Sequence, residues 1–97
     1  MPTYIALTCF TDQGIRKVKD TVKRADQVKE VAAKLGVKMK DLHWTVGQYD
    51  VIVTFEAPDD ATMTAVALAI GEQGFVRTQT LRAFSRDEMT KILAKVA

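Results

Sequence analysis

The chain has 97 residues, of which 47% are hydrophobic, and this suffices for one domain with one core but not for two. Fourteen basic and twelve acidic residues leave a net charge of +2, which excludes the strongly basic surface typical of nucleic-acid-binding proteins. A single cysteine excludes an internal disulfide, and no segment resembles a membrane span or a signal peptide. We therefore expect one cytoplasmic domain over residues 1–97, without a membrane contact.

The first half of the chain predicts a strand and then a long helix. Residues 3–10 are rich in β-branched and aromatic side chains and stop at the turn-forming "TDQG". Over residues 15–35 the apolar positions recur at three- and four-residue steps, which is typical of one helix with one buried stripe. Gly36 is placed to end this helix in the left-handed conformation that glycine adopts at little cost.

A hairpin and a second helix are predicted next. The segment "VKMKDLHWTV" (37–46) partly alternates between apolar and polar residues, and a short turn at Gly47-Gln48 joins it to a strand over residues 49–56. So short a connection makes the two strands antiparallel. Pro58, Asp59 and Asp60 then favour a helix start, and the helix continues to Gly74.

The last part of the chain adds a fourth strand over residues 75–84 and a C-terminal helix. Ser85 and Glu88 have the spacing of a capping box at the start of that helix. The element order is therefore β-α-β-β-α-β followed by α. This order predicts an α+β, ferredoxin-like fold, in which one antiparallel sheet carries two helices on a single face, with a further C-terminal helix.

Three stretches of the chain carry a family resemblance. They are "FTDQGIRKVKDT" (10–21), "GQYDVIVTFEAPDD" (47–60) and "VRTQTLRAF" (76–84). In this order they resemble the GYD family, which is named for a Gly-x-Tyr-Asp signature and whose biochemical function is generally unassigned. The resemblance implies a ferredoxin-like fold and an assembly like that of the dimeric α+β barrels.

The alternation of strand side chains separates a helix-covered face from an open face. On the helix side we expect Ile5, Leu7 and Cys9 from the first strand and Leu42 and Trp44 from the second. The third strand should contribute Tyr49, Val51, Val53 and Phe55, and the fourth Leu81 and Ala83. The open face would then carry a polar set interleaved with Ala6, Phe10, Ile52 and Phe84. That polar set is Tyr4, Thr8, His43, Thr45, Asp50, Thr54, Thr80 and Arg82.

An open sheet face with apolar side chains commonly marks an interface, and a second copy of the chain is the simplest cover. Two facing sheets would enclose a pocket suited to a small ligand. The candidate ligand-binding residues are Tyr4, Thr8, His43, Asp50, Thr80 and Arg82.

Two functional hypotheses follow from this placement. The first is a homo-oligomeric module that binds a small molecule or regulates assembly, without catalysis. The second is a cofactor-independent enzyme of the dimeric α+β barrel type, with His43 as acid–base residue, Asp50 as its orienting partner and Arg82 as the counter-charge for an anion. Fold analogy alone supports this reaction class.

Simpler structural roles compete for the same residues. Asp50 follows a tight turn, where aspartate commonly accepts hydrogen bonds from the backbone. Tyr49 and Cys9 are expected to pack in the core. We expect no metal, because one histidine and one cysteine fall short of a zinc ligand set, and no cofactor, because the glycines form no phosphate-binding motif.

RNA binding is a lesser alternative, since RNA-recognition modules share this element order. They stack bases on exposed aromatic residues of the central strands. In this chain the corresponding exposed positions include Asp50 and Glu56, whose carboxylates repel phosphate. We therefore do not expect nucleic acid as a partner.

Overall fold

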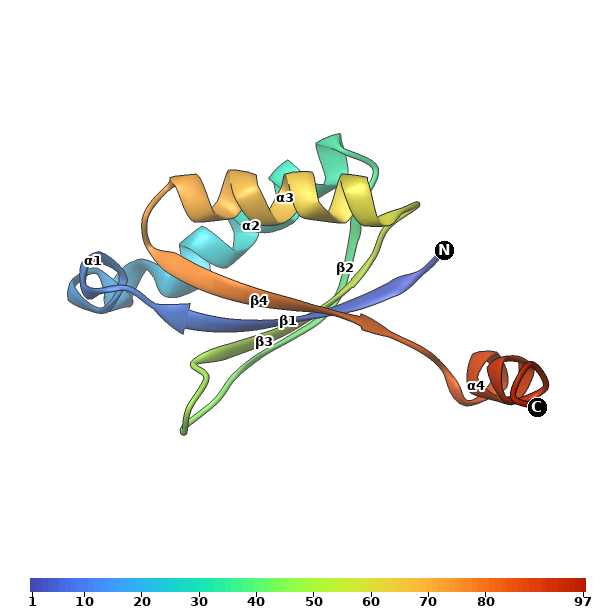
Figure 1. Ribbon diagram of the computed structural model, residues 1–97. Helices are drawn as coiled ribbons and strands as arrows, with labels where there is room; N and C mark the ends of the chain where they lie inside the picture. Colours follow the sequence, from blue (N-terminus) through green and yellow to red (C-terminus); the bar gives the residue numbers. More distant parts are fainter.

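A four-stranded antiparallel sheet with the strand order β2-β3-β1-β4 forms the centre of the computed structural model, which describes residues 1–97 (Figure 1). This topology confirms the predicted ferredoxin-like α+β fold. The elements in chain order are β1 (Thr3–Phe10), α1 (Asp12–Arg16), the short 3-10 helix η1 (Val18–Asp20), α2 (Thr21–Lys34), β2 (Lys38–Trp44), β3 (Val51–Glu56), α3 (Asp60–Glu72), β4 (Val76–Ala83) and α4 (Arg86–Leu93).

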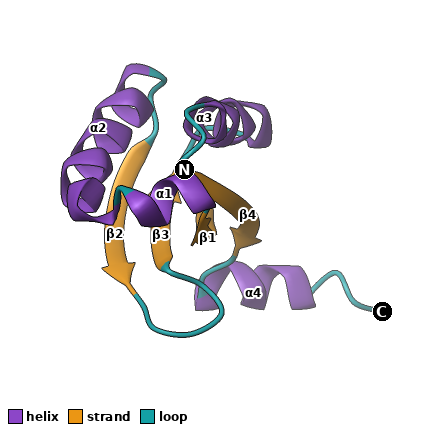
Figure 2. Cartoon of the chain, turned by 90° about the vertical axis from the view of Figure 1, so that its left-hand side faces the viewer, coloured by secondary structure: helices purple, strands orange, loops and turns teal.

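Helices α2 and α3 cover one face of the sheet, and α4 extends away from its far end (Figures 1 and 2). The radius of gyration is 14.5 Å, above the value of about 13 Å for a compact domain of about 100 residues. The principal-axis extents of 51 × 31 × 18 Å show the same elongation. The C-terminal helix therefore lies outside the compact body of the domain.

The long helix expected over residues 15–35 is interrupted, so this prediction was wrong in detail. Its first turn is the separate helix α1, capped by the Thr11 side chain, which accepts a hydrogen bond from the Gly14 amide at 3.1 Å. The Arg24 guanidinium donates to the Lys17 carbonyl at 2.8 Å, between α1 and α2. Ile15 is 54% exposed, so the predicted apolar stripe is not buried along its whole length.

The strand register corrects the predicted faces of β1 and β4. Tyr4, Ala6 and Thr8 are buried against the helices, whereas the sequence favoured their neighbours Ile5, Leu7 and Cys9 for the core. In β4, direct pairing with β1 places Val76, Thr78, Thr80 and Arg82 on the helix side and Leu81 and Ala83 on the open side. The predicted faces were right for β3 itself, where Val51, Val53 and Phe55 are buried, although the strand begins at Val51 rather than at residue 49. The core consists of Tyr4, Ala6, Ala32, Val37, Val51, Val53, Phe55, Ala57, Met63 and Val66.

The connection between β2 and β3 is longer than the two-residue turn predicted at Gly47-Gln48. It runs from residue 45 to residue 50, and its ends are joined by a hydrogen bond from the Thr45 amide to the Asp50 carbonyl at 2.8 Å. Gly47 adopts a φ of 144°, which side chains other than glycine rarely adopt. Figure 1 shows this loop on the side of the sheet opposite the helices.

The helix starts agree with the sequence. Asp59 caps α3 by accepting a hydrogen bond from the Thr62 amide at 2.7 Å. Ser85 and Glu88 form the predicted capping box at the start of α4.

Candidate functional site

Four of the six predicted ligand-binding residues lie on the face opposite to the one predicted. Tyr4, Thr8, Thr80 and Arg82 belong to the helix side of the sheet, because they pair with or alternate with buried residues. Only His43 has its predicted place on the open face, where it pairs with Ile52. A face-to-face dimer of the open faces would therefore not collect the predicted polar set.

The three candidate catalytic residues do not form a constellation. His43 is exposed, and neither a hydrogen bond nor an ion pair joins it to Asp50. Asp50 instead accepts a hydrogen bond from the Phe10 backbone amide, with a distance of 2.8 Å from nitrogen to Oδ2. Arg82 lies on the other face of the sheet. The arrangement offers no orienting partner for an acid–base histidine.

Arg82 serves the junction between β4 and α4. Its guanidinium lies 4.4 Å from the centroid of the Phe84 ring and pairs with Glu88 at 3.5 Å. The Tyr4 hydroxyl, on the same side of the sheet, donates a hydrogen bond to the Asp60 carboxylate. That hydrogen bond, together with burial, raises the pKa of Tyr4. These contacts join β4 to α4 and β1 to the start of α3.

The signature loop at residues 45–50 folds over the open face. The Tyr49 hydroxyl hydrogen-bonds the Gln79 side chain at 3.2 Å, and Gln79 pairs with the open-face residue Leu7. The Cys9 thiol reaches the Gln48 carbonyl at 3.4 Å. Tyr49 and Cys9 therefore lie on the open side, and the prediction that both pack in the core was wrong.

The open face carries more apolar surface than the sequence suggested. Ile5 pairs directly with Leu81, and Leu7 pairs directly with Ile52, so the four side chains are neighbours across three strands. Helices α2 and α3 lie on the other face of the sheet, and α4 lies beyond its end (Figures 1 and 2). Leu81 is 40% exposed and the other three are partly exposed. We call this group the open-face apolar cluster.

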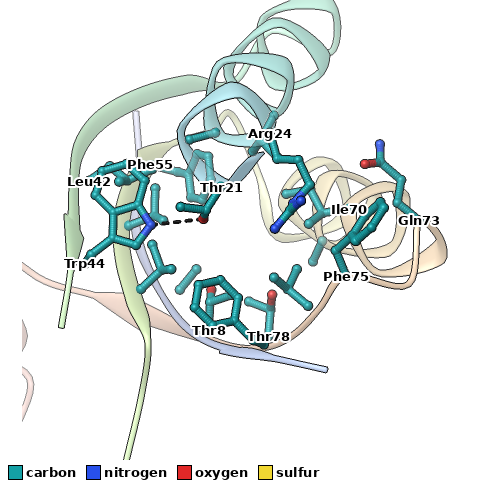
Figure 3. Close-up of a pocket in the computed structure, with 18 of the residues that line it drawn as sticks. Thr8, Thr21, Arg24, Leu42, Trp44, Phe55, Ile70, Gln73, Phe75 and Thr78 are labelled. Atoms are coloured by element: carbon teal, nitrogen blue, oxygen red, sulfur yellow. Dashed lines mark hydrogen bonds between the residues drawn. The ribbon is translucent and has the colours of Figure 1, made fainter. Parts of the chain in front are cut away.

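A cavity of about 70 Å³ lies on the opposite side, between the sheet and helices α2 and α3 (Figure 3). Fourteen of its 19 lining residues are hydrophobic, and they include the predicted helix-side residues Leu42 and Trp44. The Trp44 indole is held at the rim, where its N–H donates to the Thr21 hydroxyl at 3.1 Å. The sequence reasoning missed this cavity, because its walls come from separate elements that are far apart in the chain.

Few polar groups reach the cavity. Thr8 and Thr78 are a direct cross-strand pair on its floor, and Figure 3 shows both hydroxyls turned toward the hollow. Arg24 enters from α2 and stacks on the Phe75 ring with its guanidinium carbon 4.6 Å from the centroid. The five polar lining residues are Thr8, Thr21, Arg24, Gln73 and Thr78, so the cavity combines an apolar lining with one cation, three hydroxyls and one amide.

No cluster of three or more His, Cys, Asp or Glu side chains is arranged to hold a metal ion. None of the helices combines the length and the hydrophobicity needed to cross a bilayer.

Comparison with known proteins relates the chain to a family and to a described relative. The GYD domain family model matches residues 4–93. A relative from Thermus thermophilus, described as a glutamine synthetase and cystathionine beta-lyase binding protein, is 36% identical over 87 residues. The match covers 86% of this chain and 88% of the relative.

Proposed function

The chain belongs to the GYD domain family, and on that premise we propose that it is a non-catalytic binding module that joins a second copy of itself and a metabolic enzyme. The open-face apolar cluster is the observation that carries this proposal. Its four side chains, Ile5, Leu7, Ile52 and Leu81, are cross-strand neighbours on the face opposite α2 and α3, and all four stay at least partly exposed. Contiguous apolar surfaces of this kind mark interaction sites.

The small core supports self-association. Twelve of the 97 residues are buried although 47% of the chain is hydrophobic, so much apolar surface remains exposed in the single chain. A homodimer interface resembles a domain core cut in half and buries such surface. In the proposed dimer the second copy buries the open-face apolar cluster, as helices α2 and α3 bury the other face of the sheet.

Helix α4 supports the same proposal. Its apolar side chains Met89 and Leu93 are exposed, the latter at 59%, and the helix makes no extensive contact with other elements. An isolated helix of eight residues is marginal in water, because most helical stability comes from the packing of an apolar face. The partner chain supplies that packing surface in the proposed assembly.

The enzyme partner is inferred from the relative in Thermus thermophilus, whose description states binding to glutamine synthetase and cystathionine beta-lyase. Three candidate catalytic residues of this chain, His43, Asp50 and Arg82, do not meet in space. A protein-binding role requires no such meeting. We therefore propose regulation of an enzyme of this kind by association rather than by chemistry.

The test compares two leucine substitutions on opposite sides of the domain. Leu7→Glu places a charge within the open-face apolar cluster, whereas Leu68→Glu places the same charge on an exposed position of α3. Light scattering coupled to gel filtration measures the mass. We expect wild type and Leu68→Glu at twice the chain mass or more, and folded Leu7→Glu as a monomer. A wild-type monomer at all concentrations would contradict the self-association.

Enzyme binding is measured with purified glutamine synthetase from the same organism, immobilised on a biosensor surface. Wild type and Leu68→Glu are expected to bind, and Leu7→Glu to bind at least ten-fold more weakly, since a buried unpaired charge is costly at an interface. Equal binding of all three proteins would exclude the open face as the contact surface. Absence of binding by wild type, repeated with cystathionine beta-lyase, would exclude these enzymes as partners.

A further inference from the structure

The cavity under α2 and α3 has an apolar body that a ligand of matching chemistry would fill. Its deeper walls include Val28, Leu42, Phe55 and Met63, and its rim includes Trp44. The cavity opens to solvent, so a ligand larger than its 70 Å³ can extend through the mouth. Pockets with an apolar lining and a few placed polar groups are the usual form of small-molecule sites.

Two hydroxyls on the cavity floor lack partners within the chain. Thr8 is 7% exposed and Thr78 is partly exposed, and neither side chain makes a hydrogen bond to another residue. No fully buried side-chain polar atom is left without a partner, so these hydroxyls keep access to the cavity space. Both hydroxyls are therefore free to hydrogen-bond a polar group bound in the cavity.

Arg24 supplies a positive charge without a matching carboxylate. The two ion pairs of the protein are Lys40–Glu56 and Arg82–Glu88, and neither involves Arg24. Its guanidinium donates to the Lys17 carbonyl at 2.8 Å and to the Gly14 carbonyl at 3.4 Å. A guanidinium has five N–H donors, so three remain free. The Phe75 ring lies on one side of the guanidinium, with its centroid 4.6 Å from the guanidinium carbon, and the Arg24 side chain reaches the hollow in Figure 3.

We propose that this cavity binds a small organic carboxylate that carries a short branched chain or one aromatic ring. The carboxylate lies between the Arg24 guanidinium and the Thr8–Thr78 hydroxyl pair, and the apolar part packs beside Trp44. A planar guanidinium matches a carboxylate in geometry and in charge. A phosphate ester would bring nearly two negative charges against one cation, so the charge balance favours a monocarboxylate.

The experiment uses Trp44, the single tryptophan, as its probe. Phenylacetate is titrated into wild-type protein while indole fluorescence is followed, and phenylacetamide serves as the neutral control of the same shape. We expect a saturable change with phenylacetate and at least ten-fold weaker binding of the amide, since a charge-assisted hydrogen bond is worth about ten-fold or more in affinity. Isovalerate, the branched alternative, is titrated in parallel.

Two cavity variants and one surface variant locate the site. Arg24→Gln removes the charge, Thr8→Val removes one hydroxyl with little change in shape, and Arg16→Gln removes a charge from an exposed position on α1. We expect roughly ten-fold weaker binding for Arg24→Gln, about three-fold weaker binding for Thr8→Val and no change for Arg16→Gln. Circular dichroism confirms folding, and if Arg24→Gln does not fold, Thr8→Val decides.

Three results would overturn the proposal. The first is that neither phenylacetate nor isovalerate binds saturably. The second is that phenylacetamide binds as tightly as phenylacetate, and the third is that the folded cavity variants keep the wild-type affinity. The outcome is separate from that of the proposed function, because Leu7→Glu alters the other face of the sheet and is expected to keep the phenylacetate affinity. Either proposal can therefore fail while the other holds.

Discussion

The Asp50 carboxylate accepts a hydrogen bond from the backbone amide of Phe10, 40 residues earlier in the chain, at 2.8 Å. The Asp50 amide donates in turn to the Thr8 carbonyl at 2.9 Å. The β1–β3 ladder ends at the Thr8–Val51 pair. Asp50 follows directly outside it and adds these two hydrogen bonds between the same two segments. The aspartate of the family signature thus closes the end of the central strand pair.

Asp50→Ala is expected to destabilise the protein by about 1–3 kcal/mol, because it leaves the partly buried Phe10 amide without its acceptor. Asp50→Asn keeps a side-chain oxygen and should lose less. Urea unfolding at neutral pH measures both. Asp41→Ala, at an exposed position of β2, is the matched control and should change stability by less than about 0.5 kcal/mol. Similar losses for both alanine variants would contradict the role of Asp50.

Tyr49→Phe should have a much smaller effect than Asp50→Ala. The Tyr49 hydroxyl bonds the Gln79 side chain in an exposed setting, where water replaces a lost partner. We expect a loss of less than about 0.5 kcal/mol in urea unfolding. A loss of stability equal to that of Asp50→Ala would contradict this expectation and would mean that the tyrosine hydroxyl stabilises the loop as much as Asp50 does.

Two glycines should respond to alanine with opposite signs. A Cβ at Gly14 would lie 1.9 Å from the Phe75 carbonyl oxygen, so Gly14→Ala must displace backbone and should cost about 1–3 kcal/mol or more. A Cβ at Gly71 meets no atom within 4 Å, and this residue lies within α3. Gly71→Ala should therefore stabilise by about 0.5–1 kcal/mol. Thermal unfolding of the pair tests both, and destabilisation by Gly71→Ala would refute the second expectation.

The stability at low pH should depend in part on the cap of α3. The hydrogen bond from the Thr62 amide lowers the pKa of Asp59 below its ordinary value of 3.8. A lowered pKa in the folded state adds stability that is present above the unfolded value and is lost as the pH falls through the folded value.

Asp59→Asn keeps a capping oxygen but does not titrate. Its free energy of unfolding should therefore fall less steeply than that of wild type below about pH 4. Urea unfolding between about pH 6 and about pH 3 measures the difference. Parallel curves over this whole range would contradict the assignment.

Much of the architecture was predictable, because the helix and strand signals are local. The β-α-β-β-α-β-α order, the face of β3 and the capping box at Ser85 all follow from spacing within a few residues. The break between α1 and α2 was not predictable in this way. It is stabilised by Arg24, which reaches back to the Lys17 carbonyl, and by the close approach of Gly14 to Phe75 in a distant strand connection.

The prediction of which face of β1 is buried was wrong for a different physical reason. Ile5, Leu7 and Cys9 form the more hydrophobic row, and hydrophobicity alone assigns that row to the core. The structure instead buries Tyr4, whose hydroxyl bonds Asp60 at the start of α3, together with the small residues Ala6 and Thr8, which line the cavity under α2 and α3. An apolar face that stays partly exposed has the same composition as a core, so the pattern of one chain does not distinguish them. The cavity was missed for another reason, since its walls come from elements that are far apart in the chain.

The position of β1 in the sheet has a kinetic consequence. This strand is made first, yet both of its neighbours, β3 and β4, come from the later part of the chain. During synthesis it has no strand partner until residue 56 has emerged, and its second edge stays open until residue 83. Long-range pairing of this kind slows folding and leaves strand edges open to association. Newly made copies at high local concentration are therefore most vulnerable at this first strand.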